Sequence, residues 1–155
     1  MLKELFSLIG TRAIETMIPR LEATINKKLT RKKQIRTDLS VNGQIIEKLR
    51  EEKDTNQVKM DELKTQLETS IFNTKEGRIL DKRALNQAVR LNSIMHQLID
   101  ALGETQAMGK KIQQLDKEIY EIYFHIKNLM STCRPMTKAN IERLLQILLA
   151  VDAMK

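Results

Sequence analysis

The sequence predicts an all-α protein, a long antiparallel helical hairpin that forms a coiled coil, with short N- and C-terminal helices packed at the open end. Three observations lead to this fold class. The 155 residues include only five Gly, two Pro and 3% aromatic residues, few for the turns and strands of β or α/β folds. Two long stretches repeat apolar residues every seven positions, and a glycine-containing break separates them.

Residues 1–18 are predicted to form an amphipathic helix at the N-terminus. Leu5, Phe6 and Ile9 are spaced so that they share one helical face. Pro19 follows them and is expected to end or kink the helix, because proline lacks the backbone N–H that an inner helical turn needs.

The first arm of the hairpin is predicted over about residues 19–75. Counting a and d positions from Ile18 to Ser70, ten of sixteen are apolar and the register does not slip. The polar members are Lys28, Lys32, Asn42, Lys53, Asn56 and Ser70. A heptad repeat sustained over this length indicates a helix of roughly 55 residues, about 80 Å long, that packs against another helix.

The turn is predicted near Gly77 and the second arm over about residues 81–134. Gly77 can adopt the left-handed conformation that closes a helix, and Asp81 is a suitable N-cap for the next one. Fourteen of the sixteen a and d positions between Leu80 and Cys133 are apolar or small, so this arm is the more apolar one. Its stripe is broadened by Met95, Ile99, Leu102, Tyr120, Tyr123 and Phe124. These additional apolar side chains would be exposed in a two-helix hairpin, and a third or fourth helix would cover them. The sequence therefore predicts self-association or a helical partner.

A fold-back at Gly77 would pair residues whose numbers sum to 154. Pro19 and Pro135 then lie at the same level, and a positions of one arm meet d positions of the other. The register also brings a basic cluster of six cations within ten residues alongside Asp116, Glu118 and Glu121. The cluster consists of Lys27, Lys28, Arg31, Lys32, Lys33 and Arg36.

Residues 136–155 are predicted to form the last helix, with Thr137 as its N-cap. Its apolar residues cover more than one face, so the helix is expected to be buried on several sides. We expect it to pack on residues 1–18 and on the open end of the shaft, residues 19–134. The whole chain, 1–155, is accordingly predicted to be a single helical domain.

The sequence contains no motif typical of catalysis or of ligand binding. Gly-rich phosphate loops, nucleophile elbows and the usual zinc-ligand spacings do not occur. His96 and His125 would lie roughly 43 Å apart on one helix, and Cys133 is expected to be a packing residue of the seam. We therefore expect no enzymatic activity, no cofactor and no metal site.

Charge and hydropathy bear on partners and location. The formal net charge is +7 and the pI is near 9.6, so acidic partners are favoured electrostatically. No apolar stretch reaches the ~20 residues of a membrane span, and the start of the chain does not resemble a cleavable signal peptide. The single cysteine cannot form an internal disulfide, which suits a reducing compartment. We expect a soluble, cytoplasmic protein.

The favoured functional hypothesis is a non-enzymatic protein–protein interaction subunit, a coiled-coil scaffold, adaptor or assembly factor that forms a homo- or hetero-oligomer. Its candidate docking residues are Leu5, Phe6, Ile9, Ile141, Leu144, Leu145, Leu148, Tyr120, Tyr123 and Phe124.

Two alternatives stay open. The basic cluster Lys27–Arg36 could bind an acidic partner, or it could bind nucleic acid. In the second case the chain would be a nucleic-acid-associated accessory protein. In outline, the predicted hairpin is also similar to the long hairpins of the type III secretion export-apparatus stalk family and of rotary ATPase central stalks. That resemblance implies a secretion-apparatus chaperone or stalk factor, but it is one of shape, and shape does not assign a function.

Overall fold

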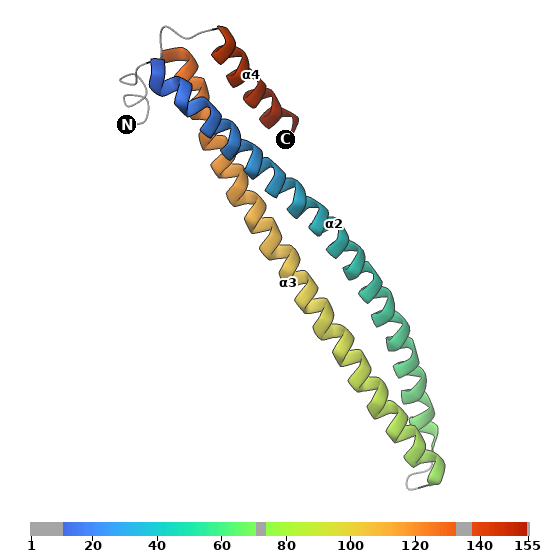
Figure 1. Ribbon diagram of the computed structural model, residues 1–155. Helices are drawn as coiled ribbons and strands as arrows, with labels where there is room; N and C mark the ends of the chain where they lie inside the picture. The colour runs from blue at the N-terminus through green and yellow to red at the C-terminus, as the bar shows by residue number, and fades with distance from the viewer. Residues whose placement is uncertain (1–10, 71–73, 133–137, 155) are drawn as a thin grey trace. The chain divides into compact units, whose positions relative to one another are not determined.

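The computed structural model describes residues 11–70, 74–132 and 138–154 (Figure 1). It confirms the predicted helical hairpin. Helix α2 (Thr11–Thr69) and helix α3 (Lys75–Thr132) form the two arms, and the shorter helix α4 (Lys138–Ala153) follows them. Within these ranges the chain contains no β-strand.

The turn lies a few residues earlier than the sequence suggested. Helix α2 ends at Thr69 and α3 already begins at Lys75, so Gly77 belongs to the first turn of α3. The N-cap is Thr74 rather than Asp81, because the Thr74 hydroxyl accepts a hydrogen bond from the Gly77 N–H at 3.1 Å. The two arms are therefore connected between Thr69 and Lys75.

Pro19 does not end a helix, in contrast to the expectation. It lies inside α2, which runs from Thr11 through to Thr69. Its neighbour Ile18 is fully buried, and Leu21 packs against the same core. Apolar contacts on both sides of the proline hold the helix together although one backbone donor is missing.

The cross-helix hydrogen bonds correct the predicted register. They join Lys28 to Glu118, Asn42 to Thr105 and Asn56 to Gln87. Together with the other side-chain contacts between the arms, these pairs have residue numbers that sum to 143–148 and not to 154. The arms are thus displaced by about one heptad from the predicted pairing, so Ile25 and Leu129 are not level with each other.

The chain divides into two compact units, each of which contains a part of both arms. Unit 1 consists of residues 1–37 and 109–155, and unit 2 of residues 38–108.

Unit 1 has the larger core, built where α4 packs on the two arms. Its buried apolar side chains come from all three helices: Ile18, Ile25, Leu29, Ile119, Ile126, Leu129, Leu144, Ile147, Leu148 and Val151. Each such side chain contributes roughly 1.5–3 kcal/mol relative to leaving it in water. Helix α4 is therefore an integral part of this core.

Unit 2 has a thinner core between two helices only. The buried apolar residues that cluster there are Ile46, Leu49, Ile94 and Ala101. Two buried amides fill further layers: Asn42 donates to the Ala101 carbonyl at 2.8 Å and to the Thr105 hydroxyl at 2.7 Å, and Asn56 accepts a hydrogen bond from the Gln87 amide at 2.8 Å. The polar seam residues Asn42 and Asn56 of α2 thus lie opposite the polar seam residues Thr105 and Gln87 of α3.

Candidate interaction surfaces

An aromatic cluster lies on α3 in unit 1. Tyr120 and Tyr123 are stacked with ring centroids 6.3 Å apart, and Phe124 meets Tyr120 edge-on at 4.7 Å. Lys127 places its ammonium 4.7 Å from the Tyr123 ring centroid, and its contact with the Tyr123 hydroxyl raises the pKa of the lysine. Tyr123 packs against the core, whereas Tyr120 and Phe124 are about half exposed, at 51% and 46%. These two rings are available to a partner.

The candidate residues on α4 fall on two different faces. Leu144 and Leu148 are buried in the core of unit 1, so they hold α4 in place and are not accessible for docking. Ile141 and Leu145 are exposed, and so is Leu149, which the sequence analysis did not select. The three exposed residues are spaced four apart and therefore share the outer face of the helix.

The N-terminal candidates Leu5, Phe6 and Ile9 lie outside the described residues. Their packing on α4 therefore stays a prediction, as does their part in docking.

Helix α4 is also attached to α2 by a two-pronged ion pair. The guanidinium of Arg143 donates to both carboxylate oxygens of Glu22, at 2.8 and 2.9 Å. This hydrogen bonding raises the pKa of Arg143. The pair fixes how α4 is oriented on the surface of α2 within unit 1.

The basic cluster is divided by its surroundings. Lys28 forms an ion pair with Glu118 at 2.7 Å, and this hydrogen bond lowers the pKa of Glu118. Lys32 is buried, pairs with Asp116 and donates to the Met154 carbonyl at 3.4 Å, at the end of α4. The predicted alignment of the cluster with Asp116 and Glu118 is therefore confirmed, and two of its six cations hold unit 1 together.

The other four cations of the cluster are exposed. Lys27 and Arg31 are four residues apart, and together with Thr24, Lys28 and Leu115 they line a hollow of about 350 Å³. Lys33 and Arg36 lie on another side of α2. The exposed charge is thus spread over two sides of the helix and does not form one basic face.

A second hollow of about 320 Å³ joins the aromatic cluster to the basic one. Tyr120 and Arg36 both line it, and its lining includes the last turn of α4. The remaining lining residues are Leu29, Lys32, Asp116, Ile119, Val151 and Met154. The hollow is therefore lined by five apolar or aromatic residues, by two cations, of which Arg36 is exposed, and by the carboxylate of Asp116, which pairs with Lys32.

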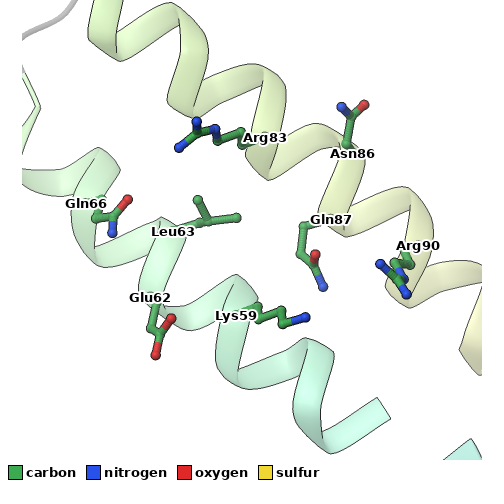
Figure 2. Close-up of a pocket in the computed structure, with 8 residues that line it drawn as sticks. All are labelled: Lys59, Glu62, Leu63, Gln66, Arg83, Asn86, Gln87 and Arg90. Carbon is green, nitrogen blue, oxygen red and sulfur yellow. The ribbon is translucent and has the colours of Figure 1, made fainter. Parts of the chain in front are cut away.

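Unit 2 contains a more polar groove between α2 and α3 (Figure 2). It has a volume of about 410 Å³, and its lining includes three cations, Lys59, Arg83 and Arg90, and one carboxylate, Glu62. In Figure 2, Leu63 points from α2 toward α3 at the floor, and Gln87 points from α3 toward α2. The Gln87 amide is held there by its hydrogen bonds to Asn56.

Several large apolar side chains of unit 2 are exposed along α3. Met95, Ile99 and Leu102 were expected to broaden the stripe, and the structure leaves them 45%, 61% and 42% exposed. Leu85 and Val89, which the sequence analysis overlooked, are exposed to 65% and 64%. Leu85 and Val89 are four residues apart, and this helical spacing could have predicted that they share one face of α3.

In the part of the chain that the structure describes, no group of three or more His, Cys, Asp or Glu side chains is arranged to hold a metal ion. Nor is any described helix long and apolar enough to cross a membrane.

Comparison with protein-family models, with curated proteins and with solved structures finds no match for this chain.

Proposed function

We propose that the protein is a non-enzymatic protein–protein interaction subunit, a helical scaffold or adaptor that docks a partner on unit 1. The single cysteine suits a reducing compartment, and the proposal places the protein in the cytoplasm.

The observation that carries the proposal is the apolar hollow beside the exposed rings of Tyr120 and Phe124. Aromatic side chains that are half exposed next to a concave apolar surface are typical anchors of protein interfaces. Arg36 at the edge of the hollow favours a partner with carboxylates beside its apolar side chain. We therefore propose as partner a helix that inserts an apolar side chain and places acidic residues near Arg36.

The test compares partners recovered by matched variants of the full chain. Proteins that co-purify with the wild-type chain are expected to be lost or strongly reduced with Tyr120→Ser/Arg36→Glu. They should be retained with Lys117→Gln, which changes an exposed residue of α3 away from the hollow. Circular dichroism of each variant checks that the helices persist. Equal recovery with both variants would contradict docking at the hollow.

The exposed cations of the basic cluster favour nucleic acid as a second candidate partner. Lys27, Arg31, Lys33 and Arg36 are exposed, and backbone phosphates are bound by such cations in a strongly salt-dependent way. A duplex-binding titration at two salt concentrations tests this candidate. Affinity that falls steeply with salt and is abolished by Lys27→Glu/Arg31→Glu would support it, whereas salt-independent or absent binding would rule it out.

A further inference from the structure

Helix α3 carries a second seam in unit 2, apolar except for Asn92 and separate from the one that faces α2. Its members alternate three and four residues apart along the helix: Leu85, Ala88, Asn92, Met95, Ile99 and Leu102. This is the spacing of a coiled-coil contact, and it extends over about 26 Å at 1.5 Å per residue. We call this set the outer seam.

In the described part of unit 2, the large apolar side chains of the outer seam are left partly exposed. Leu85 and Ile99 are 65% and 61% exposed, and Met95 and Leu102 are 45% and 42% exposed. The core between α2 and α3 uses other α3 residues, including Ala84, Leu98 and Ala101. An exposed heptad seam on a helix that already has one partner is the pattern expected of a helix in a larger bundle.

We infer that the outer seam is the interface between two copies of this chain, with their α3 helices packed antiparallel about a twofold axis near residues 93–94. This interface is on unit 2, so it adds to the docking function proposed for unit 1 and does not depend on it.

The seam matches itself in this arrangement. Antiparallel pairing about that axis sets Leu85 against Leu102 of the second copy, Ala88 against Ile99, and Asn92 against Met95. Large residues meet at both ends, and the small Ala88 leaves room for Ile99, as interdigitating side chains require. Each contact occurs twice because a twofold interface is isologous. The exposed side chain of Val89 would be covered by the region around His96 of the second copy.

Charges on α2 favour the same axis. The contacts of Asn42 with Thr105 and of Asn56 with Gln87 place the midpoint of the outer seam level with residues 50–52 of α2. Arg50 and Asp54 lie there, and both are exposed. The twofold axis would therefore set Arg50 of each copy near Asp54 of the other, giving two opposite-charge pairs.

These two residues also lie on the correct side of the hairpin, since Arg50 and Asp54 are e and b positions of α2, as the members of the outer seam are of α3. The polar groove of unit 2 is lined by the g positions of both arms, including Lys59, Arg83 and Arg90 (Figure 2). In an antiparallel pair, the e positions of both helices therefore share the opposite side. Arg50 is an e position of α2, and Met95 and Leu102 are e positions of α3, so the charges flank the outer seam.

The test is the oligomeric state of the full chain, measured by sedimentation over a range of concentrations. The wild-type chain is expected to form a dimer. Leu85→Glu/Ile99→Glu should weaken dimerisation on the order of tenfold or more, because it buries unpaired carboxylates in an apolar interface. The control Val58→Glu changes an equally exposed apolar residue of α2 outside the seam and should leave the dimer unchanged. Circular dichroism checks that both variants keep their helices.

A charge exchange tests whether the partner that packs on the outer seam is a second copy of this chain. Arg50→Asp alone should weaken the dimer, since it sets two carboxylates opposite each other, and adding Asp54→Arg should restore it. Restoration requires that both residues of each pair come from this chain, and it would support the twofold arrangement. A wild-type chain that stays monomeric, a dimer that survives the seam variant, or failure of the exchange to restore dimerisation would each overturn the inference. Dimerisation that responds to Tyr120→Ser/Arg36→Glu instead would also overturn it, because the contact would then lie on unit 1.

Discussion

Lys32 has an environment that the other cations of the basic cluster do not share. It occupies an a position of α2 and is only 5% exposed, yet it carries a charge. Asp116 of α3 and the carbonyl of Met154, the residue that follows α4, both contact its ammonium, so one side chain links α2 to α3 and to the C-terminal end of α4. The position near the C-terminal end of α4 also places the cation at the negative end of the helix dipole.

Removing Asp116 tests how far this network depends on the ion pair. We expect Asp116→Asn to lower the free energy of unfolding by about 1–2 kcal/mol, because the buried ammonium loses its charged partner while Asp116 itself is half exposed. In a Lys32→Met background the same change should cost less than about 0.5 kcal/mol, since the charge to be compensated is gone. Urea denaturation of the four chains measures the coupling, with the exposed Lys33→Met as control. An equal cost in both backgrounds would contradict a role for the pair.

Sequence reasoning could identify Lys32 as a seam residue but not as the buried member of its cluster. Its heptad position indicated that it faces α3, and the acidic residues opposite were recognised. What decides its burial is α4, whose last turn covers it, and the packing of α4 on α2 is a tertiary contact that no local pattern reports. The leucines of α4 illustrate the same point. Leu144 and Leu148 are buried whereas Leu145 and Leu149 are exposed, and only the packed core shows which are which.

At the scale of the elements, the heptad repeats predicted both arms well and their relative register poorly. A shift of one heptad leaves every a position opposite a d position, so apolar periodicity cannot distinguish the two pairings. The prolines suggested the wrong alternative, because Pro19 was expected to end or kink its helix at the level of Pro135, and the helix continues through it.

The polar seam residues contained the better signal for the register. Asn42 and Asn56 interrupt the seam of α2, and Thr105 and Gln87 are the two polar interruptions of the α3 seam. Pairing each buried amide with one of these residues, as the structure does, satisfies their hydrogen bonds and determines the register. Buried polar layers thus specify an alignment that the apolar layers leave open.

Two glycines inside the arms offer a test at the same scale. Apart from its chain neighbours and the backbone of its own helical turns, an alanine methyl group at Gly43 or Gly109 would meet no atom within 4 Å. Each of Gly43→Ala and Gly109→Ala should therefore raise the free energy of unfolding by about 0.5–1 kcal/mol, because alanine loses less conformational freedom in a helix. The reverse change at an exposed position of α3, Ala107→Gly, should lower it by a similar amount. Thermal denaturation followed by circular dichroism measures all three, and a lower melting temperature for either alanine variant would show that the glycine is required.

For the whole molecule, the two units differ in what stabilises them. Unit 1 buries ten apolar side chains from three helices in its core, whereas the core of unit 2 has four from two helices. A two-helix hairpin has little apolar surface to bury for its length. The most exposed apolar residues of α3, including Leu85 and Ile99, belong to unit 2. Unit 2 is therefore the part of the molecule that gains most from a further helix.

Hydrogen exchange should report this difference directly. In dilute solution, we expect backbone amides of α3 around Ile94 to exchange faster than those around Ile126, because local opening exposes fewer buried contacts in unit 2. Raising the protein concentration should slow exchange in residues 85–102 and leave the amides around Ile126 unchanged, since self-association across the outer seam covers only unit 2. The variant Leu85→Glu/Ile99→Glu should abolish the concentration dependence. Uniform exchange along α3, or added protection that falls on unit 1, would contradict this division of stability.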